Sequence, residues 1–221
     1  MVKKDSSVDK FEIVAIVKKV FREEVEKLGM PRDYIVKTID YIWRRADKIP
    51  DVISRIEDLI EIGRGNLSAV IKSTEAERKR AVSIARYIDL LSGEEKIAWS
   101  GKLEPEAYLW KTVVGVSGAK CSCPDALWNV VHAYKGLRII NKRLAVEAEI
   151  KLVFDRYQLC KHVLALLGIL LYRYGVEPYQ KHVRVLSVNA LLAVIGESGK
   201  RPPRDAYRAV YGVVRKIIDE L

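Results

Sequence analysis

The chain has 221 residues, of which 49% are hydrophobic and 31% charged, and its formal net charge is +10. This composition excludes a disordered chain, and the length is sufficient for one or two domains with a sizeable core. The longest apolar run, residues 163–171, is too short for a membrane helix, which needs about 20 residues. We therefore expect a cytoplasmic, membrane-free protein whose thiols stay reduced, because the start of the sequence shows no signal-peptide pattern.

The first hundred residues predict a helical bundle, because apolar residues recur at helical spacing. Four amphipathic helices are expected within residues 8–31, 32–50, 51–65 and 73–93. Glycine or proline follows each pattern as a stop signal, and Gly63 and Gly65 close the third. Thr74 and Glu77 have the spacing of a capping box at the start of the fourth.

The pattern changes near residue 100. Residues 107–123 are rich in aromatic and β-branched residues and contain two glycines, which predicts a strand, a tight turn and a short second strand. Helical patterns return in residues 161–175, 183–196 and 203–221, and residues 197–204 have the composition of a loop. We expect a mostly helical α+β protein with three regions, at residues 1–103, 104–172 and 173–221.

The segment between Cys123 and Cys160 allows two interpretations. Residues 144–154 alternate between apolar and other residues as a strand does, but they also place their apolar residues on one helical face. Asn141 could cap such a helix, and Ala, Glu, Lys and Leu dominate the segment. These residues favour a helix without excluding a strand.

The three cysteines and one of the three histidines fall into two short pairs. Cys121 and Cys123 are separated by one residue, as are Cys160 and His162. On a strand, Cys121 and Cys123 point to the same face, and Cys160 and His162 open a helix whose positive end favours thiolates. A disulfide would leave one cysteine unpaired and His162 unexplained. Three sulfurs and one imidazole match a closed, structural zinc site, so we predict one zinc ion per chain.

These residues resemble the SWIM-type zinc finger, whose ligands follow the pattern C-x-C-x(n)-C-x-H. The resemblance covers about a third of the chain, residues 107–172, and includes Pro124, Asp125 and the lead-in hairpin. The spacer of 36 residues between Cys123 and Cys160 is longer than the family's commonest form. The resemblance implies a module that binds DNA or proteins.

A narrower resemblance concerns the SWIM subunit of the Shu complex, which carries an alanine three residues after the histidine ligand. Ala165 matches that position. This likeness implies a role in homologous recombination and DNA repair, with a paralogue of the RecA-like recombinase as a partner.

The basic charge also favours contact with a polyanion such as nucleic acid, although a merely basic surface is an alternative. Seven cations in and around the predicted zinc module lack an acidic neighbour within two positions, so we expect them to contact DNA: Lys111, Lys120, Lys135, Arg138, Lys142, Arg143 and Lys161. No catalytic residues are predicted, and we expect a protein that is not an enzyme. The alternative is a protein-interaction adaptor with a structural zinc. Gln occurs only at positions 158 and 180, which predicts a thermophilic source.

Overall fold

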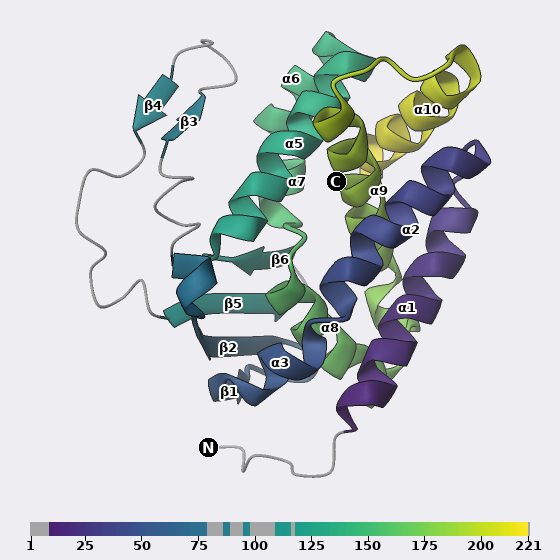
Figure 1. Cartoon of the computed structure of the whole chain (residues 1–221). Helices are drawn as coiled ribbons and strands as arrows, with labels where there is room; N and C mark the ends of the chain where they lie inside the picture. Colours follow the sequence, from purple (N-terminus) through teal and green to yellow (C-terminus); the bar gives the residue numbers. More distant parts are fainter. Residues whose placement is uncertain (1–8, 79–85, 89–94, 98–108, 116–117, 221) are drawn as a thin grey trace.

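The computed structural model describes residues 9–78, 86–88, 95–97, 109–115 and 118–220. Helices pack against one face of a small antiparallel sheet, which lies at one end of the molecule (Figure 1). The fold is mostly helical α+β, as the sequence predicts. Among the described residues, no helix combines the length and the hydropathy needed to span a bilayer.

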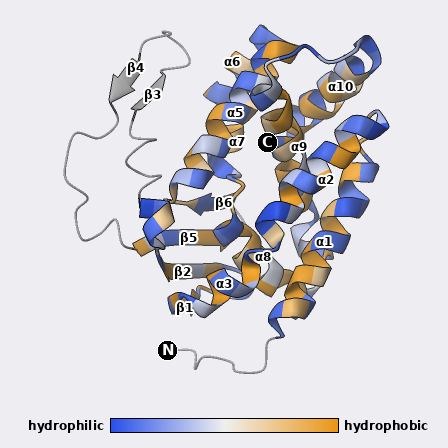
Figure 2. Ribbon diagram, viewed as in Figure 1, coloured by the Kyte–Doolittle hydropathy of each residue, from blue (hydrophilic) through white to orange (hydrophobic). Residues whose placement is uncertain are grey.

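The first two predicted helices are confirmed as α1 (Lys10–Glu26) and α2 (Arg32–Ala46). Asp9 caps α1, since its Oδ1 accepts a hydrogen bond from the backbone N–H of Phe11 at 2.8 Å. Hydrophilic and hydrophobic residues follow one another within the turns of both helices, as expected of helices with one buried side (Figure 2). A short third helix, α3, follows at Ile49–Ser54.

The predicted helix over residues 51–65 is wrong beyond α3. The chain instead forms a hairpin of β1 (Ile56–Glu61) and β2 (Leu67–Lys72). Gly63 and Gly65 have φ angles of 64° and 85°, so these glycines form the turn of the hairpin rather than the end of a helix. In β2, Leu67, Ala69 and Ile71 alternate toward the core, and this burial favours strand over helix.

The predicted fourth helix is confirmed only at its start. Thr74 and Glu77 form the expected capping box, with reciprocal bonds of 2.8 and 3.2 Å, and residues 75–78 are helical. Further along, β3 (Arg86–Ile88) pairs with β4 (Glu95–Ile97), so the prediction of a helix through residue 93 is wrong there. Its remaining residues, 79–85 and 89–93, lie outside the described parts of the chain.

The predicted strands at residues 107–123 are present as β5 (Leu109–Gly115) and β6 (Gly118–Cys121). With the first hairpin they make an antiparallel sheet of order β1-β2-β5-β6. Thr112 pairs with Cys121 across β5 and β6, and both side chains face the core. Lys111, Val113 and Lys120 therefore lie on the opposite, exposed face of the sheet.

The centre of the molecule is α8 (Lys161–Tyr174), in which every residue from 162 to 171 is buried. This helix packs against the sheet and also against α1, α2 and α3. Residues of all three predicted regions therefore share one hydrophobic core. The boundaries near residues 104 and 173 stay a prediction.

The ambiguous segment is helical and consists of α5 (Pro124–Ile140), α6 (Lys142–Ile150) and α7 (Val153–Arg156). Asn141 caps α6, because its Oδ1 accepts a hydrogen bond from the N–H of Leu144 at 2.9 Å. After a short 3₁₀ turn (Glu177–Tyr179), α9 (Gln180–Ser198) packs against α5, and α10 (Arg204–Glu220) covers α5, α6 and α9.

Candidate metal centre

The two predicted ligand pairs meet between the sheet and the N-termini of two helices. Cys121 is the last residue of β6, and Cys123 is the N-cap of α5. Cys160 is the N-cap of α8, and His162 lies in the first turn of that helix. Two helix N-termini therefore point their positive ends at the cluster, which favours the thiolates that zinc binds.

The ligand atoms of Cys121, Cys123, Cys160 and His162 all lie within 4.8 Å of one another, and all four side chains are buried. The Nδ1 atom of His162 is 3.6 Å from the Sγ of Cys121. In a tetrahedral site with Zn–S bonds of about 2.3 Å, neighbouring ligand atoms are ~3.8 Å apart. The donor set and its spacing therefore fit one zinc ion held by four protein ligands.

Polar side chains fix the segment that carries the second ligand pair. The backbone of Gln158 binds β6 through the carbonyl of Ala119 at 2.8 Å, and its side-chain Oε1 accepts from the N–H of Cys121 at 2.9 Å. Asn129 accepts a hydrogen bond from the N–H of Leu159 at 3.1 Å. This partly buried network holds Cys160 beside Cys121, although the two are far apart in the sequence.

Hydrogen bonds to sulfur make Cys121 the most acidic thiol of the cluster. Burial raises the pKa of Cys121, but hydrogen bonds with Cys123, Cys160 and Thr112 outweigh it and hold the pKa well below its ordinary value. The Thr112 hydroxyl donates to the Cys121 Sγ at 3.1 Å, and the backbone N–H of Cys123 does so at 3.4 Å. A thiolate at Cys121 is the form that binds a metal.

Glu77 connects the metal centre to the rest of the fold, in addition to its predicted role in the capping box. Its Oε1 lies 3.4 Å from the Nε2 of His162 and 2.5 Å from the Nζ of Lys161. Its Oε2 accepts from the indole N–H of Trp110 at 3.0 Å, and Arg55 forms an ion pair with it. Burial raises the pKa of Glu77, but its bonds to His162 and Lys161 hold it far below its usual range.

The position of Glu77 indicates which nitrogen of His162 would bind the metal. Nε2 lies next to the carboxylate, and Nδ1 is the nitrogen that lies 3.6 Å from the Sγ of Cys121. A carboxylate behind a histidine ligand fixes the ring's tautomer and makes it a stronger ligand. No sequence signal links Glu77 to the zinc pattern, because it lies outside the motif.

We expect Glu77→Gln to weaken zinc binding by about 10- to 100-fold, the usual effect of removing a carboxylate behind a ligand. Gln keeps the size of the side chain but removes the charge that faces His162 and Lys161. Competition with a calibrated chelator measures the affinity. Glu57→Gln, an exposed residue of β1, is the matched control, and equal affinities of both variants would contradict a role for Glu77.

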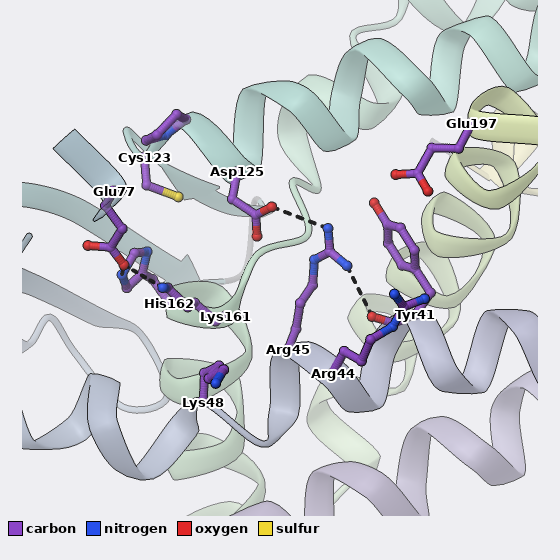
Figure 3. Close-up of a pocket in the computed structure, with 11 residues that line it drawn as sticks. Tyr41, Arg44, Arg45, Lys48, Glu77, Cys123, Asp125, Lys161, His162 and Glu197 are labelled. Atoms are coloured by element: carbon purple, nitrogen blue, oxygen red, sulfur yellow. Dashed lines mark hydrogen bonds and ion pairs between the residues drawn. The ribbon is translucent and has the colours of Figure 1, made fainter. Parts of the chain in front are cut away.

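A pocket of about 310 Å³ lies against the metal centre (Figure 3). It is lined by α2, by the first turns of α5 and α8, and by Glu77 and Glu197. Within it, Arg45 forms an ion pair with Asp125 at 3.2 Å and covers the ring of Tyr41 at 3.8 Å. Asp125, part of the C-x-C-P-D motif, thereby joins α2 to the start of α5.

The seven cations predicted to contact DNA do not form one face. Lys111 and Lys120 are exposed on the outer face of the sheet, and Lys161 lines the pocket. The other four lie on the second half of α5 and the start of α6: Lys135, Arg138, Lys142 and Arg143. Helix α5 has 17 residues and is about 25 Å long, so Lys142 and Arg143 lie far from the zinc ligands.

Two of the seven cations form ion pairs, although no acidic residue lies within two positions of them in the sequence. Arg138 forms an ion pair with Glu149 at 2.6 Å, and Lys161 forms one with Glu77 at 2.5 Å. Both carboxylates come from other elements of the fold, which a search of sequence neighbours cannot reveal. The other five are exposed: Lys111, Lys120, Lys135, Lys142 and Arg143.

Comparison with known families gives a match to the SWIM zinc finger over residues 104–134 and 152–170. Neither the curated proteins nor the solved structures include a match to this chain. The family match skips residues 135–151, which form the end of α5 and all of α6, so this part of the long spacer is an addition to the finger. Together with the cluster of Cys121, Cys123, Cys160 and His162, the match identifies a SWIM-type zinc finger in this chain that fits one zinc ion.

Proposed function

We propose that this protein is a nucleic-acid-associated factor that contains a structural zinc and performs no catalysis. The observation that carries the proposal is the SWIM zinc finger with its complete Cys₃His cluster. The net charge of +10 supports it, because a basic surface attracts phosphates. Four protein ligands fill a tetrahedral zinc, which is the arrangement of structural rather than catalytic sites.

The outer face of the sheet is the part of the finger best suited to contact nucleic acid. Lys120 on β6 is paired with Val113 on β5, and Lys111 is on the same face two residues away. Neither lysine has an ion-pair partner among the described residues, and both are exposed. Lysines of this kind contact phosphates and carry little sequence information, so binding is weakly sequence-specific.

Binding should therefore depend steeply on salt. On duplex DNA each phosphate contact contributes about −0.9 to the slope of log K against log salt. We expect the double variant Lys111→Glu, Lys120→Glu to weaken binding and to reduce the slope by about 2. Fluorescence anisotropy at several salt concentrations measures both quantities.

The control for this experiment is Lys19→Glu, Lys37→Glu, which makes the same charge change on exposed positions of α1 and α2. It should keep most of the wild-type affinity. If both double variants bind alike, the sheet face is not the contact surface. If the wild-type protein binds no nucleic acid at low salt, the proposed function itself is wrong.

A finer proposal is that the protein assists a RecA-like recombinase in homologous recombination and DNA repair. It is supported by Ala165, three residues after His162, which fits the pattern C-x-H-x-x-A. Ala165 is fully buried in α8, so it acts through packing rather than by touching a partner. Affinity capture from an extract of the source organism, examined for RecA-like ATPases, tests this proposal.

A protein-interaction adaptor is the second candidate, and exposed apolar residues favour it. Val146, Ile150 and Leu152 expose 45%, 77% and 51% of their surface. Leu152 also has a φ of 53°, a conformation that costs a leucine energy. An apolar patch of this kind suits a protein partner. Capture of a partner together with no nucleic-acid binding would favour the adaptor.

A further inference from the structure

The loop before α10 and the first turns of that helix carry exposed cations that the sequence analysis did not single out. They are Lys200, Arg201, Arg204 and Arg208. None of the four has an ion-pair partner among the described residues. By contrast, Arg215, further along the same helix, binds both Glu147 and Asp219, at 2.6 and 3.0 Å. Within this loop and helix, the cations without an ion-pair partner therefore lie at and before the beginning of α10.

Two tyrosines lie among these cations. The rings of Tyr207 and Tyr211 are almost parallel, with an angle of 13° and centroids 6.5 Å apart. The guanidinium of Arg201 lies over the Tyr207 ring at 5.1 Å. Tyr207 is thus partly covered, whereas Tyr211 remains 37% exposed. The surface combines cations with an accessible aromatic ring.

Helix α6 meets α10 only further along that helix. Glu147 pairs with Arg215 at 2.6 Å, and the Nζ of Lys151 donates to the carbonyl of Ile218 at 2.6 Å. Both contacts lie in the second half of α10, away from the cations at its start.

We propose that this surface, called the α10 surface, binds single-stranded nucleic acid. It consists of four cations and one accessible ring: Lys200, Arg201, Arg204, Arg208 and Tyr211. The cations fit the phosphates of the strand, and Tyr211 offers a face on which a base can stack. A base must be unpaired to stack in this way, and this requirement selects single strands over a duplex.

This inference rests on the proposed function and adds a second contact surface to it. The two surfaces lie far apart, because the sheet and α10 are at different ends of the molecule (Figure 1). The α10 surface also lies outside the residues that match the SWIM zinc finger. It is therefore separate from the finger itself.

The test compares a fluorescent 15-nucleotide oligothymidine with a duplex of the same length. Arg204→Glu, Arg208→Glu should weaken single-strand binding by about 10-fold or more and flatten its salt slope by about 1.4, at −0.7 per phosphate. Tyr211→Ala should weaken single-strand binding by roughly 5- to 100-fold, with little effect on the duplex. Tyr211→Phe keeps the ring and should bind almost as the wild type does.

The control is again Lys19→Glu, Lys37→Glu, and unchanged thermal melting shows that each variant is folded. If the wild type binds nucleic acid but the arginine variant and Tyr211→Ala keep its single-strand affinity, the α10 surface is not a contact and only this inference is wrong. If Tyr211→Ala weakens duplex and single-strand binding equally, the assignment to single strands is wrong. If the wild type binds neither probe, the proposed function fails as well.

Discussion

Replacing Cys160 by serine is expected to unfold the protein as a whole. Cys160 is the N-cap of α8, and α8 packs against the sheet and against α1, α2 and α3. Structural zinc sites in small fingers contribute about 10–16 kcal/mol of binding free energy. Whole domains are stable by only ~5–15 kcal/mol. Loss of one ligand at the start of the central helix should therefore remove the cooperative melting transition.

Elemental analysis and thermal unfolding together check this result. The wild type should contain one zinc per chain and melt in one transition, and the Cys160→Ser variant should show neither. A strong chelator should reproduce the effect in the wild type, and added zinc should reverse it. The matched control is Ala165→Ser, which buries a hydroxyl in the same helix without touching a ligand and costs about 1–3 kcal/mol. A zinc-free wild type that melts normally would contradict the prediction.

The metal ligands could be predicted from the sequence because their chemistry and spacing are local. Cys121 and Cys123 form one pair and Cys160 and His162 form the other, and each pair lies at the end of a strand or the start of a helix. Three cysteines and one histidine are one of the usual donor sets of a structural zinc site. The sequence could not show how the pairs are brought together, because the bonds of Gln158 and Asn129 depend on the complete fold.

The first hairpin shows why local patterns mislead. Residues 56–61 have apolar residues at spacings that suit a helix, yet they form β1. The deciding contacts come from β2, which pairs with β5, a strand about 40 residues further along the chain. Such non-local pairing overrides helix propensity, which amounts to a few tenths of a kcal/mol per residue. The available signal in the sequence was the turn with Gly63 and Gly65 between two runs that contain β-branched residues.

The ion pairs of Arg138 and Lys161 could not be predicted from the sequence for the same reason. Arg138 and Glu149 are 11 residues apart and lie on two helices, α5 and α6. Glu77 comes from before the sheet's second hairpin, yet it touches both Lys161 and His162. A search of neighbouring positions finds partners within a helix turn, but these carboxylates are neighbours only after folding. No sequence pattern pointed to Arg201, Arg204 and Arg208, because their loop and helix lie outside the zinc-finger motif.

Gly136→Ala is expected to be among the most destabilising substitutions outside the metal centre. A Cβ at Gly136 would lie 1.9 Å from the carbonyl oxygen of Leu192, and a Cβ at Gly196 would lie 2.0 Å from that of His132. These contacts are with backbone, so no side-chain rotation can relieve them, and α5 and α9 must move apart. Overpacking of a core costs 1–3 kcal/mol and occasionally more, and we expect about 3 kcal/mol here.

For a chain of this size, about 3 kcal/mol corresponds to a decrease in Tm of roughly 6–12 °C. The matched control is Gly212→Ala in α10, where the added Cβ has no neighbour within 4 Å. At that exposed helix position the same substitution should stabilise the protein by about 0.5–1 kcal/mol, because alanine favours helix over glycine. Opposite shifts of Tm would show that helix propensity is not the cause at Gly136. If Gly136→Ala melted as Gly212→Ala does, the close contact of α5 and α9 would be disproved.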